Sequence, residues 1–236
     1  MDLLGFGLAE APHLIAAFSD LCALHVDDGI RFDAQSIRAE EIRKEANYAG
    51  IRVTLLGWVD GARCPVQVDV GYGDAVTPGP AAAEYPVMLG EFPAPKLRVY
   101  PRHTVVAEKL QALITLGVAN SRMKDYFDLW VLAKHSDFEG EVLREAIGAT
   151  LSRRGTGIPT DVPFGLSESF ATHPQKQMQW QGFLKKNRLE ALPLVQIVAA
   201  LRKFLMPPLS ALASGQDFGG VWNREAWNGA ARKLKQ

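Results

Sequence analysis

The sequence predicts a protein of the α/β class, with strands and helices in its first half and helices in its second half. Apolar residues alternate with other residues over 51–59 and 64–70, which predicts the two strands of a β-hairpin. Apolar residues at helical spacing predict a helix over 104–116 and an interrupted helical pattern from residue 137 onward. We therefore expect an α/β domain that ends near residue 135, followed by a mostly helical C-terminal domain.

The composition is that of a globular protein of one or two domains. The chain has 236 residues, of which 47% are hydrophobic and 22% are charged. It contains no run of about 18 apolar residues and no basic leader, so we expect neither a membrane span nor a signal peptide. Cys22 and Cys64 suggest no disulfide framework or zinc site and fit a reduced, cytoplasmic protein. The formal net charge of zero counts mildly against a nucleic-acid partner but does not exclude a local basic patch.

The first half begins with a predicted helix over 10–24, where apolar residues recur at helical spacing. Two short strands are expected next, over 30–33 and 36–43. After the hairpin, the proline-rich segment 73–95 is expected to form an irregular connection. A further short strand over 96–100 then leads into the next predicted helix.

The hairpin determines the direction in which the side chain of Asp69 points. Asp60-Gly61 is a turn signal between the two strands. On the returning strand, alternation places Val68 and Val70 on one side and Asp69 on the other. From the residues alone, Asp69 belongs to an exposed polar face of the sheet.

The two helices after the last of these strands bring charge close to apolar residues. Lys109 lies on the same stripe as Val105 and Ala112, where an ammonium group is costly unless it meets an anion. On the following helix, which opens near residues 122–124 and ends near 135, Asp125 and Asp128 share a face. Alternatively, Lys109 extends to solvent and the aspartates only favour the positive end of the helix dipole. The residues alone leave both interpretations open.

The second half is expected to consist of helices separated by loops. Pro207-Pro208 is expected to end the fourth of them. The predicted helices run over 139–151, 167–171, 175–185, 192–205 and 222–234.

Several segments together resemble one protein family. AEKLQAL, at 107–113, and SRMKDYFDL, at 121–129, resemble the paired motifs of the AbiEii-type nucleotidyltransferase toxins, whose catalytic core is similar to that of DNA polymerase β. MDLLGFG, at 1–7, resembles the end of the family's first metal motif, and CPVQVDV, at 64–70, resembles its third-carboxylate strand. Residues 158–184 resemble its C-terminal helical half. The pieces cover most of the chain, and their combination is specific.

The resemblance implies a nucleotidyltransferase-like core over 1–135, with a small mixed β-sheet flanked by helices, and a helical domain over 136–236. It also implies that the chain begins inside the first metal motif, between its two aspartates, so that only the second, Asp2, is present. A mis-assigned start, a removed N-terminus and a natural loss of activity would each leave this sequence. This chain is therefore expected to be a weak enzyme at most.

By resemblance, the reaction transfers a nucleoside monophosphate from a nucleoside triphosphate to an RNA acceptor, with tRNA the best candidate, and uses Mg²⁺. Such in-line displacements need carboxylates to hold the metal and cations to meet the phosphates. The resemblance makes Asp2 and Asp69 the metal ligands and Lys109 the main contact to the triphosphate. Asp125 is expected to orient the acceptor or the lysine.

Lys124 and Arg122 are weaker candidates for binding the triphosphate. The family resemblance also implies growth arrest that is restrained by a separately encoded antitoxin protein. A different interpretation is a degenerate, non-catalytic scaffold of the same fold that binds a protein or RNA partner. The absent aspartate favours the scaffold, whereas the presence of Asp69, Lys109 and Asp125 favours the enzyme.

Overall fold

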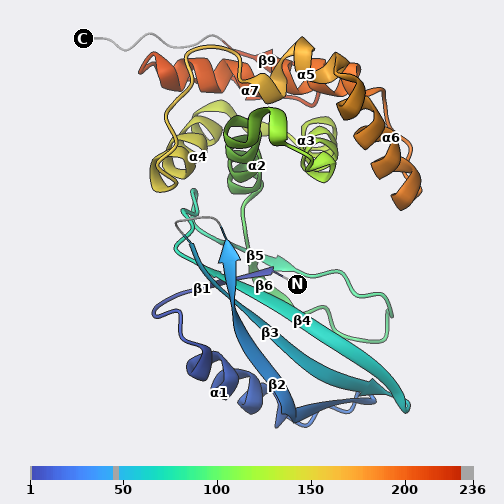
Figure 1. Cartoon of the computed structure of the whole chain (residues 1–236). Helices are drawn as coiled ribbons and strands as arrows, with labels where there is room; N and C mark the ends of the chain where they lie inside the picture. Colours follow the sequence, from blue (N-terminus) through green and yellow to red (C-terminus); the bar gives the residue numbers. More distant parts are fainter. Residues whose placement is uncertain (1, 45–47, 230–236) are drawn as a thin grey trace. The chain divides into compact units, whose positions relative to one another are not determined.

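The structure, a computed structural model, describes residues 2–44 and 48–229 (Figure 1). Contacts between residues divide the chain into two compact units, Met1–Asp74 and Ala75–Gln236. Within the described residues, the first unit holds a four-stranded sheet and one helix, and the second is mostly helical. The predicted α/β class is confirmed.

The sheet of the first unit is small and mixed. Its strand order is β1-β4-β3-β2; β1 pairs with β4 in parallel, and the other neighbours pair antiparallel. The elements of this unit are β1 (Asp2–Gly5), α1 (Ala11–Cys22), β2 (Ile30–Lys44), β3 (Tyr48–Val59) and β4 (Ala62–Tyr72).

Alternation along the hairpin gives this sheet an apolar face and a polar face. On β3, Ile51 and Val53 are buried, and on β4 so are Val68 and Val70. These side chains form a core with Leu14 of α1, which covers this face (Figure 1). The alternate residues of β3 and β4 lie on the opposite side, which we call the polar face.

The expected hairpin is confirmed, with β3 and β4 joined at Asp60-Gly61. The two short strands expected over 30–33 and 36–43 are instead one strand, β2. Its register with β3 shifts between Asp33 and Arg38, which is where the sequence pattern breaks. A β-bulge of this kind keeps the strand continuous although its alternation is interrupted.

The second unit begins with a two-stranded sheet. Its first strand, β5 (Ala81–Glu84), lies in the segment 73–95 that was expected to be irregular, and it pairs with β6 (Lys96–Val99). Alanine-rich residues have little strand propensity of their own, so pairing with β6 decides this conformation.

The rest of the second unit is helical. The helices are α2 (Arg102–Leu116), α3 (Met123–His135), α4 (Gly140–Arg153), α5 (Glu168–Thr172), α6 (Pro174–Asn187) and α7 (Leu194–Ala213). Two 3-10 turns, η1 (Gly117–Ala119) and η2 (Phe164–Leu166), and a small sheet of β7 (Phe138–Glu139), β8 (Val221–Trp222) and β9 (Trp227–Asn228) complete it.

Helix α7 is the core helix of this unit. Ile197, Leu201 and Phe204 are fully buried in a cluster that also contains the rings of Tyr126 and Trp180. Among the described residues, α7 also has the length and composition of a membrane-spanning helix, but half of its apolar window is buried inside the protein. Its apolar character is accounted for by this packing.

Two expectations for the C-terminal half are wrong. Helix α7 does not end before Pro207-Pro208 but continues to Ala213, because the burial of Pro208 and Leu209 offsets the missing N–H donors. The helix expected over 222–234 is absent from 222–229, where Trp222 ends β8 and Trp227–Asn228 form β9, and residues 230–234 lie outside the described residues. Tertiary contacts override the local helical pattern here, because the indole of Trp222 donates a 2.7 Å hydrogen bond to the carbonyl of Ala133.

The two compact units do not coincide with the division expected after residue 135. Helices α2 and α3 contact α4, α6 and α7, and therefore belong to the same unit as the later helices. The expected division stays a prediction about where a catalytic core would end.

Gly140 tests the packing of the second unit. A Cβ atom at this position would lie 2.6 Å from the carbonyl oxygen of Gly220 and 2.7 Å from that of Phe218. Because backbone must move to relieve these contacts, we expect Gly140→Ala to lower the free energy of unfolding by about 3 kcal/mol, measured by urea denaturation.

Gly182→Ala is the matched control, because nothing lies within 4 Å of a Cβ added there on helix α6. It should raise the free energy of unfolding by roughly 0.5 to 1 kcal/mol through helix propensity. Equal effects of the two substitutions would contradict the packing argument.

Candidate functional site

The first group of charged side chains lies on the polar face of the sheet in the first unit. Asp2 of β1 and Asp69 of β4 are register partners in neighbouring parallel strands, so their side chains emerge from the same face. Gly5 allows β1 to lie here, because a Cβ at that position would be 2.4 Å from the ring of Tyr72. The strand that carries Asp69 is thus directly beside the strand that carries Asp2.

Arg52 neutralises one of these two carboxylates. It is the register partner of Asp69 on β3. Its Nε donates to Oδ1 of Asp69 at 2.8 Å and its Nη2 donates to Oδ2 at 2.9 Å. These hydrogen bonds raise the pKa of Arg52. A bidentate pair of this kind both orients the carboxylate and offsets the repulsion from a neighbouring acid.

The carboxylate pair suits a hard cation that takes its remaining ligands from water and phosphate. Within the described residues, no group of three or more His, Cys, Asp and Glu side chains is arranged to hold a metal ion. A cation that binds Asp69 must also compete with the guanidinium of Arg52, which contacts both carboxylate oxygens. Asp2 and Asp69 therefore fit a divalent ion as a pair whose charge is partly compensated.

The second group of charged side chains lies in the second unit, between α2 and α3. The ammonium of Lys109 donates to Oδ1 of Asp125 at 2.9 Å and to Oδ2 of Asp128 at 2.7 Å. Arg122 approaches the other oxygen of Asp125 at 2.8 Å, and Lys124 donates to Asp128 at 2.6 Å. We call these five residues the Lys109 cluster.

Burial makes the ion pairs of the Lys109 cluster stronger than those of a protein surface. The side chain of Lys109 is 17% exposed and that of Asp125 is 4% exposed. Burial by itself would lower the pKa of Lys109, but the hydrogen bonds and charges of Asp128 and Asp125 outweigh it and raise that pKa. Likewise, burial would raise the pKa of Asp128, and its hydrogen bonds to Lys109 and Lys124 lower it instead.

These contacts decide between the two interpretations of Lys109. Its ammonium meets two carboxylates and does not simply extend to solvent. The cluster contains three cations and two carboxylates, so it carries an excess of one positive charge. Arg122 and Lys124 hold this excess where anions can reach it, with side chains 59% and 72% exposed.

The structure therefore brings the site residues expected from the sequence together in two groups, one in each unit. Asp2 lies beside Asp69, and Lys109 contacts Asp125, while Arg122 and Lys124 join the same cluster. Their functional roles stay predictions.

Sequence reasoning overlooked two cations. Arg52 could have been found, because the two-residue turn after Val59 sets a register that places it opposite Asp69. Lys176 could not, because nothing in its polar helix signals burial. It is 3% exposed, its Nζ donates to the carbonyl of Asn120 at 2.7 Å, and burial lowers its pKa. Lys176 thereby supports the loop that leads into α3.

One family model matches most of the chain. The family model described as "Nucleotidyl transferase AbiEii toxin, Type IV TA system" matches residues 1–206. Among solved structures, JHP933 from Helicobacter pylori is similar with a TM-score of 0.40 and 16% identity, over 80% of this chain and 72% of that one. A second Helicobacter pylori protein, provisionally named a nucleotidyltransferase, has a TM-score of 0.35 and 13% identity, over 82% and 72% of the two chains. No curated protein sequence matches the chain.

The ion pairs of Lys109 should contribute to stability over a defined range of pH. Lys109→Met keeps most of the side-chain volume but removes the charge, and we expect it to lower the free energy of unfolding by about 2 kcal/mol at neutral pH. Urea denaturation measures this loss, and Lys203→Met on the exposed face of α7 serves as the control.

The pH dependence follows from the two pKa shifts. The contribution of Asp128 is present above its ordinary pKa of 3.8 and is lost as the pH falls through its lower value in the folded protein. The contribution of Lys109 is present below 10.5 and is lost as the pH rises through its raised pKa. The difference between wild type and Lys109→Met should therefore shrink outside this range. A difference that is constant with pH would show that these ion pairs do not cause it.

Proposed function

This chain belongs to the AbiEii family of nucleotidyltransferase toxins of type IV toxin–antitoxin systems, and we propose that it transfers a nucleoside monophosphate to an RNA, with tRNA the best candidate. Membership of this family implies nucleotidyltransferase activity, a nucleoside triphosphate substrate and an antitoxin partner. The RNA acceptor, the use of Mg²⁺ and a cytoplasmic location are parts of the proposal. In the reaction, a hydroxyl of the acceptor attacks the α-phosphorus of the triphosphate, and pyrophosphate leaves.

The pairing of Asp2 with Asp69 is the observation that carries the proposal. Two carboxylates on one face of neighbouring strands form a donor set for a hard divalent cation. When bound, Mg²⁺ supplies positive charge that stabilises the attacking and leaving oxygens. Asp2 and Asp69 would hold it, and family members generally use a divalent metal ion.

Arg52 has two effects on this pair. It holds the carboxylate of Asp69 in one orientation through both of its oxygens. It also supplies a positive charge beside two adjacent acids, which would otherwise repel each other. The sheet can therefore keep Asp2 and Asp69 side by side without a metal ion, and metal binding exchanges one cation for another at Asp69.

The Lys109 cluster is proposed to bind the triphosphate. The exposed side chains of Arg122 and Lys124 meet its charge first, and Lys109 contributes from a fixed position. Asp125 and Asp128 hold the ammonium of Lys109 through two hydrogen bonds, so little conformational entropy is lost when the substrate binds. Asp125 is thereby proposed to orient the lysine.

A non-catalytic scaffold is the second candidate. It is favoured by the engagement of both oxygens of Asp69 by Arg52, which leaves no fully free carboxylate group at that position. Such a protein would bind its RNA or antitoxin partner without consuming nucleotide. Measurement of nucleotide transfer separates the two functions.

A transfer assay with radiolabelled nucleoside triphosphates and purified tRNA tests the enzyme. We expect label to appear slowly in the RNA over a long incubation, and we expect Asp69→Asn and Lys109→Met to reduce it to background because each removes charge that stabilises the transition state. Each variant is assayed below its melting temperature.

Asp137→Asn is the control for the transfer assay, because it removes an exposed ion pair with Arg224. It should retain the wild-type rate. RNA binding without transfer of label from any of the triphosphates would reject the enzyme and favour the scaffold.

Competition between Arg52 and a metal ion gives a separate prediction. Arg52→Gln removes the guanidinium from Asp69, so we expect Mn²⁺, used as a spectroscopic substitute for Mg²⁺, to bind about 10-fold more tightly by electron paramagnetic resonance titration. Asp2→Asn should weaken binding. Weaker Mn²⁺ binding by Arg52→Gln would show instead that Arg52 is needed to orient Asp69.

A further inference from the structure

A row of three exposed or partly exposed side chains crosses the polar face of the first unit's sheet, at the end away from Asp2 and Asp69. Arg31 of β2, Trp58 of β3 and Arg63 of β4 are register partners across three adjacent strands. Register partners point to the same face of a sheet, so the indole lies on the strand between the two guanidinium groups. We call these three residues the Trp58 row.

The two arginines of the Trp58 row are available to bind an anion. Both are exposed, and neither forms an ion pair or hydrogen bond with another described residue. By contrast, Arg52 is paired with Asp69 and Arg144 with Glu141. The row thus presents unpaired positive charge beside an aromatic ring.

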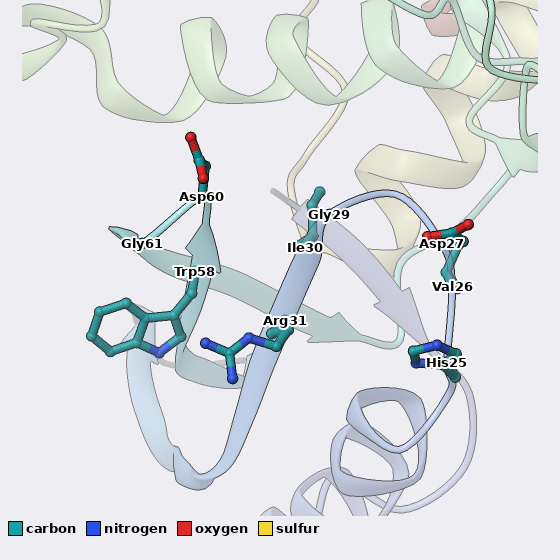
Figure 2. A pocket seen from close by; sticks show the side chains of 9 residues that line it. All are labelled: His25, Val26, Asp27, Gly29, Ile30, Arg31, Trp58, Asp60 and Gly61. Atoms are coloured by element: carbon teal, nitrogen blue, oxygen red, sulfur yellow. The ribbon is translucent and has the colours of Figure 1, made fainter.

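A hollow of about 320 Å³ opens at this end of the sheet. Figure 2 shows the guanidinium of Arg31 extending toward the indole of Trp58, and both line the hollow. The carboxylates of Asp27 and Asp60 also line it but point away from that guanidinium (Figure 2). The hollow therefore offers a ring face together with a cation.

Acidic residues near the Trp58 row are used in local turns. Asp28 accepts a hydrogen bond from the amide of Ile30, and Asp33 accepts one from the amide of Gln35, both at 2.9 Å. Asn and Asp side chains commonly stabilise turns in this way. These carboxylates consequently do not neutralise Arg31 or Arg63 by direct pairing.

Charge changes sign along the polar face. Arg63 and Asp69 both lie on β4 and point to this face, and their separation of six positions along the strand corresponds to about 20 Å. Arg31 and Arg63 lie at one end, level with Trp58, whereas Asp2, Glu40 and Asp69 lie toward the other end, level with Arg52. A polyanion is attracted to the first end and repelled from the second unless a metal ion is bound there.

We propose that the Trp58 row binds a single-stranded segment of the RNA acceptor, with one base stacked on Trp58 and the flanking phosphates paired with Arg31 and Arg63. The assignment rests on the proposed function for the role of that RNA as acceptor. Aromatic rings that stack bases, with arginines along the backbone, are the usual means of binding single-stranded nucleic acid. A local row of this kind also reconciles RNA binding with a net charge of zero.

Fluorescence anisotropy with a short labelled single-stranded RNA, in EDTA and without nucleotide, tests the assignment on the full chain. We expect Trp58→Ala to weaken binding about 10-fold and Trp58→Phe to retain most of the affinity, because a phenyl ring still stacks. Arg31→Gln and Arg63→Gln should each weaken binding several-fold and reduce the dependence of log Kd on log salt by about one.

Arg202→Gln is the matched control, because Arg202 is an exposed arginine on α7. Its RNA affinity should be unchanged. An equal loss by the control and the Trp58 row variants would indicate non-specific attraction and would overturn the proposal. Unchanged RNA affinity in folded variants of the Trp58 row would also overturn the proposal. So would a result in which the chain binds an acidic protein through this row but does not bind RNA.

Photocrosslinking keeps the proposal testable even where a variant folds poorly. RNA carrying 5-bromouridine is irradiated on the wild-type chain, which is then digested with trypsin. Crosslinked nucleotide is expected on the peptide Val53–Arg63, in which Trp58 is the single tryptophan. Crosslinks confined to other peptides would contradict the assignment.

Failure of this inference can be distinguished from failure of the proposed function. RNA binding is measured without nucleotide or metal, and transfer is measured separately. If the wild-type chain transfers no nucleotide but the Trp58 row variants lose RNA binding, the proposed function fails and the inference is supported. Normal binding and transfer by the row variants would reject the inference and leave the enzyme intact.

Discussion

Strand register in the first unit determines which charges meet, and the other features of the polar face depend on it. β4 pairs with β1 on one side and β3 on the other, which brings Asp2, Asp69 and Arg52 into one row. A shift of one residue in either pairing would move the whole set of side chains to the opposite face. The apolar contacts of Val68 and Val70 with α1 oppose such a shift, because it would expose them. Hydrophobic packing on one face thus holds the charges in place on the other.

Electrostatic compensation takes different forms in the two units. Arg52 is a partly exposed counterion for Asp69, so the proposed divalent ion would replace it at moderate cost. The ion pairs of Lys109 are more buried, and removal of one partner leaves charge in a medium that solvates it poorly. The first arrangement suits exchange of cations, and the second suits a cation held in one position. Each property matches the role proposed for that group in nucleotide transfer.

The sequence predicts a segment correctly where its conformation depends on neighbouring residues, and incorrectly where it depends on distant ones. The hairpin and the helices α2 and α3 have clear alternation or helical spacing and a turn signal, and the structure agrees with them. The prolines at 207–208 and the segment 222–229 carry local signals that burial overrides. In the latter, hydrogen bonds from the indoles of Trp222 and Trp227 to distant carbonyls stabilise β8 and β9. No local rule contains those partners.

By itself, the sequence determined the fold class, the family motifs and the identities of the charged candidates, because periodicity and motif spacing are properties of neighbouring residues. Only the tertiary structure decided that Arg52 neutralises Asp69, that Lys109 is held by Asp125 and Asp128, and that Arg31 and Arg63 flank Trp58. These arrangements join residues from different strands or helices. Their energies depend on distance and burial, which are established only when the elements pack.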